Sequence, residues 1–168
     1  FIIEAEDLVY VSVRLFTSAQ LYQAGGVVSK GLAALGEEFR VGTFRNLGNL
    51  TGSQSQYLNF ISVLATQDNT TVNFSNFGNG VTIINDAETS NILLNTGESY
   101  VIAASPSSNP DNAEGFIGVL VESDKPIAVN SGSITGSNAN LDDGDYGQDV
   151  GIDQVAPVER IGSEYIFV

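Results

Sequence analysis

Short runs of β-branched and aromatic residues follow one another along the whole chain, and almost no segment has a helical pattern. The single helical candidate, residues 30–38, is interrupted by two glycines. Short strands separated by polar turns are typical of β-sandwiches and barrels. We therefore predict an all-β fold, an antiparallel β-sandwich or barrel-like module. Strands are expected at residues 10–16, 57–66, 71–74, 81–84, 91–94, 99–104, 116–121 and 126–129.

Residues 57–66 carry the clearest strand signal, because apolar side chains occupy both of their alternating faces. A strand that is apolar on both faces is expected in the middle of a sheet rather than at its edge. The polar turn at 67–70 leads into a second strand at 71–74. Together these segments predict a hairpin.

Two further turns predict which strands are neighbours. Gly97 stands where a tight turn needs a positive φ, which favours pairing of 91–94 with 99–104. A turn is also expected at 122–125, between two short strands. Pro126 lacks a backbone donor and should therefore stand at a strand start or at an edge.

Three segments have loop composition: residues 48–56, 105–114 and 131–149. The first is rich in Gly, Ser and Gln, and the second contains two prolines. The third is the longest; it is Gly-, Ser- and Asn-rich and then acidic. Loops of this length in a small domain are usually functional or disordered.

Two pairs of segments in the chain resemble each other. Residues 3–11 align without gaps on 121–129, and residues 35–41 align on 161–167. The two matches occur in the same order and at nearly equal spacing. This pattern predicts a module cut from a tandem repeat array.

The repeat hypothesis divides the chain into three parts. Residues 1–45 would hold the end of one unit and the start of the next, residues 46–130 a central β module, and residues 131–168 an acidic Gly-rich loop and the opening strand of a following unit. A single domain over residues 1–168 is the alternative. In an array, the strand-like terminal segments would pair with a neighbouring unit rather than with each other.

The residue types that are missing exclude several kinds of chemistry. The chain has no Cys and no His, so disulfides, thiol nucleophiles, zinc–thiolate sites and Ser-His-Asp catalysis are ruled out. A net charge of −14, with no basic residue between Arg45 and Lys125, argues against a nucleic-acid partner. No apolar run is long enough to predict a membrane span. Chemistry that uses carboxylates alone remains open.

The acidic segment near the C-terminus is the candidate metal site. Calcium prefers several carboxylate oxygens on a flexible backbone. The candidate ligands are Asp142, Asp143, Asp145 and Asp149. A solvated acidic loop is the alternative. The adjacent acids Glu37–Glu38 and Asp142–Asp143 are poor candidates for a glycosidase pair, because neighbouring side chains on a strand point apart.

Four segments, in order along the chain, resemble one known family. They are FISVLATQDNTTV at 60–72, LLNTGESY at 93–100, VESDKPIAVNSG at 121–132, and DQVAPV with GSEY at 153–165. These segments are similar to the N-terminal domain of IgG-Fc-binding proteins. The same module occurs in large surface proteins of gliding and environmental bacteria. The cysteine-rich repeats of the animal relatives are absent here, which favours the bacterial setting.

The resemblance implies a non-enzymatic, extracellular or cell-surface module for adhesion or surface binding. Its expected partners are neighbouring repeats or subunits of the same protein, and surface polysaccharide or glycoprotein. A structural subunit of an extracellular filament or sheath is the alternative function. A carboxylate-based glycosidase is a third. Binding residues are expected on loops, which strands hold in place.

Overall fold

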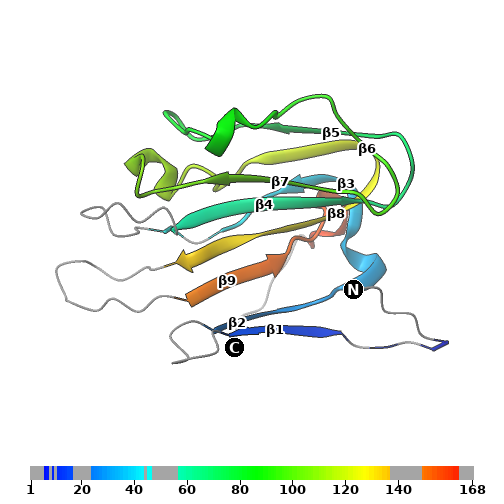
Figure 1. Ribbon diagram of the computed structural model, residues 1–168. Helices are drawn as coiled ribbons and strands as arrows, with labels where there is room; N and C mark the ends of the chain where they lie inside the picture. Colours follow the sequence, from blue (N-terminus) through cyan, green and yellow to red (C-terminus); the bar gives the residue numbers. More distant parts are fainter. Residues whose placement is uncertain are drawn as a thin grey trace.

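The computed structural model describes residues 6–7, 9, 11–16, 24–43, 45–46, 57–136 and 149–162 (Figure 1). The strands are β1 Ser12–Phe16, β2 Ala24–Val28, β3 Leu35–Arg40, β4 Leu58–Ala65, β5 Thr70–Ser75, β6 Ile92–Leu94, β7 Ser99–Ala104, β8 Leu120–Gly136 and β9 Asp149–Gln154. Short 3₁₀ helices are η1 Gly31–Ala34, η2 Ile84–Asp86, η3 Pro110–Ala113 and η5 Val158–Arg160. The described residues form no α-helix. The all-β prediction is confirmed.

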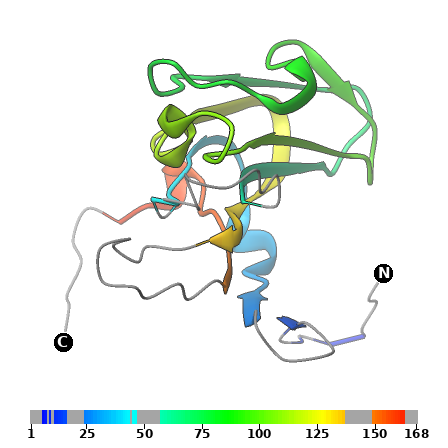
Figure 2. The ribbon, with the colours of Figure 1, turned by 60° about the vertical axis from the view of Figure 1, so that its left-hand side comes forward.

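The long strand β8, of 17 residues, organises the main sheet. The sheet order is β6-β5-β8-β4-β7, and β3 and β9 also pair with β8. Every pairing is antiparallel. β1 and β2 form a separate two-stranded sheet. The main sheet curls into a half-barrel (Figure 2), so the expected antiparallel, barrel-like architecture is confirmed.

Both predicted hairpins are wrong, because the two strands of each expected hairpin do not pair with each other. β4 and β5 each pair with β8, and they do so in succession: Ala65 lies opposite Ile127, and Val72 lies opposite Ser123. The turn between them therefore shifts the chain along β8 instead of folding it back. Likewise, β6 pairs with β5 and β7 with β4. Gly97 does adopt the positive φ expected of it, at 80°. In both cases, each strand pairs with strands that are more distant in the sequence than the expected partner.

The turn predicted at 122–125 is absent, because β8 runs through this segment without a break. β3 pairs Glu38 with Glu122 but Gly36 with Ile127. Between these two pairs, one residue of β3 faces four residues of β8, 123–126, so this stretch of β8 bulges. Pro126 lies in this bulge, where no ladder donor is required. The proline therefore marks an irregularity inside a strand, and not a strand start.

The β8 bulge packs against the turn that joins β4 to β5. The Lys125 ammonium donates hydrogen bonds to the carbonyl oxygens of Asp68 and Asn69, the latter at 3.0 Å. The backbone N–H of Thr71 donates to Asp124 Oδ1 at 2.7 Å. The two segments lie in separate motifs of the family resemblance. These contacts bring the polar parts of the two motifs together.

Other local predictions also require correction. Residues 81–84 form no strand, and residues 30–38 form η1 followed by the start of β3. The long loop expected at 131–149 is shorter, because β8 extends to residue 136. Residues 48–56 and 137–148 lie outside the described residues, as do most of the terminal segments.

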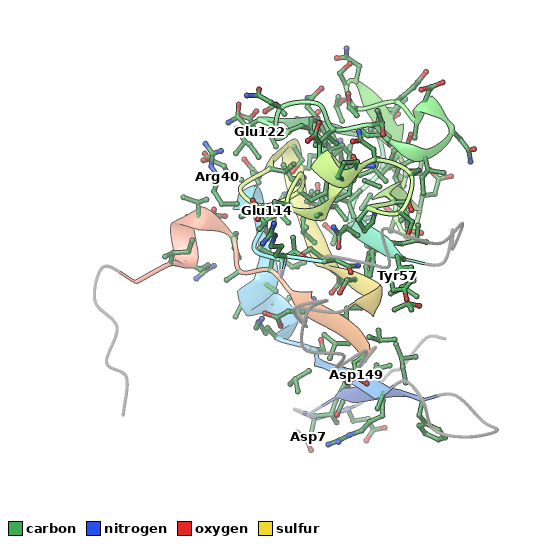
Figure 3. All side chains as sticks on the ribbon, turned by 90° about the vertical axis from the view of Figure 1, so that its left-hand side faces the viewer. Asp7, Arg40, Tyr57, Glu114, Glu122 and Asp149 are labelled. Atoms are coloured by element: carbon green, nitrogen blue, oxygen red, sulfur yellow. The ribbon has the colours of Figure 1, made fainter. Side chains whose placement is uncertain are left out.

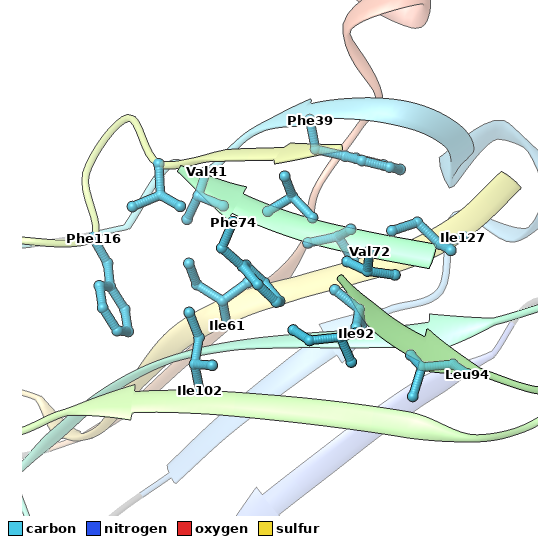
Figure 4. Packing of buried hydrophobic residues seen from close by; sticks show 14 of the residues in the cluster. Phe39, Val41, Ile61, Val72, Phe74, Ile92, Leu94, Ile102, Phe116 and Ile127 are labelled. Atoms are coloured by element: carbon cyan, nitrogen blue, oxygen red, sulfur yellow. The ribbon is translucent and has the colours of Figure 1, made fainter. Parts of the chain in front are cut away.

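The core lies inside the curl of the sheet, between β5–β6 and β4–β7 (Figure 4). Alternate residues of β4 point into it, and β4 has neighbours on both sides, as its sequence predicts. Each buried large apolar side chain contributes roughly 1.5–3 kcal/mol. The core cluster contains Phe39, Val41, Ile61, Val63, Ala65, Val72, Phe74, Ile92, Leu94, Ile102, Ala104, Phe116, Val119, Val121, Ile127 and Val129.

Asp68, in the turn beside the β8 bulge, should make stability depend on pH. Hydrogen bonds from the Thr96 side chain and from its backbone N–H, the latter at 3.0 Å, lower the pKa of Asp68, and the Lys125 ammonium adds to this effect. A lowered pKa stabilises the fold above the ordinary aspartate pKa of about 4. That stabilisation disappears as the pH falls through the lower pKa of the folded state.

We therefore expect Asp68→Asn to lower the melting temperature at neutral pH but not once Asp68 is protonated in the folded protein. Melting curves recorded from pH 7 down to strongly acidic pH test this, with Glu37→Gln as the exposed-carboxylate control. An Asp68→Asn deficit that stays constant down to acid pH would contradict the assignment.

Candidate functional site: a polar cleft built on loops

A cleft of about 510 Å³ opens where loops meet at one end of the main sheet. Its size falls in the range of small-molecule and cofactor sites. Three segments form it: the chain after β3, the loop after β5, and the η3 loop that precedes β8. The lining residues are Arg45, Gly78, Asn79, Pro110, Asp111, Ala113, Glu114, Gly115 and Ile117.

Arg45 and Glu114 form an ion pair at the cleft, with 2.6 Å between Arg45 Nε and Glu114 Oε1. Both side chains are more than half exposed, at 58% and 59%. Exposed ion pairs contribute only about 0–1 kcal/mol to stability. This pair is therefore easily rearranged, and its guanidinium and carboxylate can turn toward a ligand. Figure 3 shows Glu114 among the side chains.

A second carboxylate, that of Asp111, lies against the backbone of Gly80. A Cβ added to Gly80 would lie 2.1 Å from Asp111 Oδ2, and Gly80 has a φ of +76°. Only glycine satisfies both conditions without strain. The Asp111 carboxylate therefore lies beside the loop after β5.

Buried asparagines hold the cleft loops against the sheet. Asn59 on β4 and Asn112 on η3 are both fully buried. Asn59 Nδ2 donates to the carbonyl oxygen of Asn112 at 2.8 Å. Asn112 Nδ2 donates to the carbonyl oxygen of Ser105 at 2.9 Å, and Asn112 Oδ1 accepts from the backbone N–H of Thr82 at 2.9 Å. Asn112 thus ties two loops together and, through Asn59, to β4.

Further hydrogen bonds complete this support. Asn109 caps η3, because its side chain accepts from the backbone N–H of Asp111 at 3.1 Å, and its Nδ2 donates to the Gly80 carbonyl at 2.7 Å. The backbone N–H of Asn46 donates to the Ala113 carbonyl at 3.0 Å. Buried hydrogen bonds of this kind restrict how the loops can move. The loops of the cleft are therefore preorganised.

The cleft offers a guanidinium, two carboxylates and glycine backbone. Exposed Ile117 adds an apolar surface. Such groups can donate to and accept from hydroxyls and amides. A carboxylic acid used as a general acid is normally shielded from water, whereas Asp111 and Glu114 are both exposed. The arrangement therefore suits reversible binding of a polar ligand.

The structure places only one of the predicted calcium ligands. Asp149 begins β9, and its Oδ1 accepts a hydrogen bond from the Ala24 backbone N–H at 3.0 Å. Asp149 lies well away from Glu114 (Figure 3). Asp142, Asp143 and Asp145 lie outside the described residues. Within the part of the chain that is described, no three acidic side chains gather as a metal site. Calcium at these four residues stays a prediction.

The cleft residues were not found from the sequence. Arg45 and Glu114 are far apart in the chain, and nothing local pairs them. A partial signal exists in Asn109-Pro110-Asp111, where a capping residue, a proline and an acid follow in order, as at many helix starts. The sequence singled out 105–114 only as a loop. The acids Glu37 and Glu38 are exposed on β3 and do not line the cleft.

The fold and the site together define a class: an all-β module with a preorganised polar cleft on its loops. Residues 27–168 match the family model described as IgGFc binding protein, and the chain belongs to this family. The match covers all strands from β3 to β9, and it confirms the resemblance seen in the four motifs. No curated protein and no solved structure is similar enough to count as a match. No helix in the described ranges has the length and hydropathy needed to cross a membrane.

Proposed function

We propose that the protein is a non-enzymatic, extracellular module for adhesion or surface binding in a large bacterial surface protein. The Arg45–Glu114 cleft is the binding site in this proposal. Membership of a family described by its binding supports the general class. The observation that carries the proposal is the exposed ion pair above a glycine-lined cleft whose loops are fixed by buried asparagines.

The partner that best suits this chemistry is a surface polysaccharide or a glycoprotein. Sugar hydroxyls can accept from the Arg45 guanidinium and donate to the carboxylates of Asp111 and Glu114. The apolar face of a sugar ring can lie on Ile117, which is 46% exposed. The net charge of −14 disfavours strongly anionic polymers, nucleic acid among them. Neutral or weakly basic partners are therefore preferred.

A structural subunit of an extracellular filament or sheath is the second candidate. The similarity between residues 3–11 and 121–129 supports it, because repeated modules stack on their neighbours. Under this candidate the cleft would be incidental, and changes in the cleft would leave partner binding unaffected.

Binding measurements on cleft variants distinguish these functions. The partners are a purified neutral bacterial exopolysaccharide, a desialylated mucin-type glycoprotein and a human IgG Fc fragment, each immobilised and exposed to the full chain. We expect Arg45→Ala and Glu114→Gln each to weaken the binding seen by about tenfold, which is about 1.4 kcal/mol. The matched controls are Arg160→Ala and Glu159→Gln, both exposed on η5 and outside the cleft. Equal losses in the controls, or no binding to any of the three, would overturn the proposal.

A further inference from the structure

Among the described strands, β7 and β1 each pair with one strand only, as do β3 and β6; β6 has only three residues, and β3 carries three charged residues. β7 pairs with β4, and β1 pairs with β2; among the described residues neither has a second neighbour. The β1–β2 sheet lies beside β9, where a Cβ added to Gly25 would be 2.3 Å from the Val150 carbonyl oxygen. The strands therefore succeed one another from β7 through β4, β8, β9 and β2 to β1 (Figure 1).

The free backbone groups of β7 can be assigned from its ladder. The backbone N–H of Ala65 donates to the Glu98 carbonyl at 3.0 Å. Hydrogen-bonded pairs alternate along an antiparallel ladder. Tyr100 and Ile102 therefore direct their backbone groups to β4, and Val101 directs its own outward. The Val101 side chain is 53% exposed.

The same reasoning applies to β1. The backbone N–H of Ser29 donates to the Val11 carbonyl at 3.0 Å. By alternation, Ser12, Arg14 and Phe16 direct their backbone groups away from β2. Every residue of β1 is exposed, and Phe16 is 69% exposed.

Neither edge has the usual protection against pairing. Natural edge strands are commonly blocked by proline, lysine or a bulge. β7, with the sequence SYVIAA, contains no proline and no charged residue, and its register with β4 is regular. β1 is also regular and contains one charge, that of Arg14. Neither strand therefore has a proline or a bulge that would block pairing, although the β5–β6 loop contacts β7 through the hydrogen bond from Tyr100 Oη to the Glu88 carbonyl.

β1 and β7 lie in stretches of the chain that differ in charge. Residues 8–36 contain Arg14 and Lys30 and no acid. Residues 46–124, which include β7, contain eight acids and no base. Lys30 is already paired with Asp153, at 2.8 Å, so Arg14 supplies the available positive charge beside the β1 edge. Because Glu6 and Asp7 precede β1, the attraction to the acidic stretch around β7 rests on Arg14, which lies on β1 itself.

We propose that β1 of one copy of this chain adds to the β7 edge of the next copy, so that the copies join head to tail. The two edges have similar lengths, five and six residues. A contact between two different surfaces of the same chain does not close on itself unless the rotation forms a ring, and it therefore builds open arrays. This contact is separate from the cleft.

Sedimentation velocity on the full chain, up to about 1 mM, tests the contact over the range of weak association. We expect concentration-dependent association that Val101→Pro weakens by at least about tenfold, because proline removes the outward donor without breaking a ladder bond to β4. Val101→Lys and Arg14→Glu should act in the same direction, and they keep the test valid if the proline variant does not fold. Leu93→Lys, at a 61% exposed residue of β6, is the control and should associate normally.

The absence of cysteine in the chain allows a second readout. Leu15→Cys and Val101→Cys place one thiol on each edge. Mixing the two variants under oxidising conditions should give a disulfide-linked heterodimer faster than either variant alone gives a homodimer. A monomeric wild type, equal weakening by Leu93→Lys, or faster homodimer formation would each overturn the proposal. Unchanged association of Arg45→Ala would show that the edge contact does not depend on the cleft.

Discussion

We expect Asn112→Ala to lower the free energy of unfolding by about 3 kcal/mol. The substitution removes three hydrogen bonds: those that Asn112 Nδ2 donates to the Ser105 carbonyl and to Thr82 Oγ1, and the one that Asn112 Oδ1 accepts from the Thr82 backbone N–H. Each such hydrogen bond contributes about 1 kcal/mol net. Because Asn112 ties two cleft loops together, the variant should also lose partner binding at the cleft.

Urea denaturation measures this loss. The dependence of the unfolding free energy on urea concentration should be the same as in the wild type. Asn109→Ala is the comparison: it removes the η3 cap, which is worth about 1 kcal/mol, and the hydrogen bond from Asn109 Nδ2 to the Gly80 carbonyl, but it leaves the buried Asn112 in place. If Asn112→Ala costs less than the loss of this cap, the buried network does not hold the loops as described.

Gly132→Ala should be nearly as damaging, with a loss of about 3 kcal/mol. A Cβ at this position would lie 1.9 Å from the carbonyl oxygen of Gly151 on β9. The obstacle is backbone, so β8 and β9 would have to separate. Gly132 ends the motif VESDKPIAVNSG, and the close approach of β9 is a physical reason for a glycine there.

The control for this variant is Gly42→Ala. Nothing lies within 4 Å of a Cβ built at Gly42, so the change should alter stability by less than about 0.5 kcal/mol. Denaturation and amide exchange in β9 measure both variants. Normal protection of the β9 amides in Gly132→Ala would contradict the observed β8–β9 pairing.

The strands were more predictable from the sequence than their partners were. The alternation of residues 57–66 predicts a central strand, and residues 99–104 form β7 within their predicted bounds. These signals depend on local side-chain periods. Pairing depends on β8, whose first half binds β3 and β5 and whose second half binds β4 and β9. A strand that joins four others at long range leaves no local signal, so the two hairpins expected from turn chemistry were wrong.

The candidate site was less predictable still. Acidic clusters such as 142–149 stand out in a sequence, whereas Arg45, Asp111 and Glu114 are single charges in ordinary loops. Their meeting depends on the buried Asn59 and Asn112, which a sequence shows only as polar residues. The tandem repeat likewise stays a prediction, since its matching segments lie partly outside the described residues.

The most direct test of the account is to map partner binding on the ¹⁵N-labelled chain by NMR. The titrant is whichever of the exopolysaccharide, the mucin-type glycoprotein or the Fc fragment binds best to the immobilised panel. We expect the largest shift changes at the backbone amides of Arg45, residues 78–80 and residues 111–117, with little change along β1 and β7. Shift changes confined to other surfaces, with the cleft amides unaffected, would contradict the assignment of the cleft as the binding site.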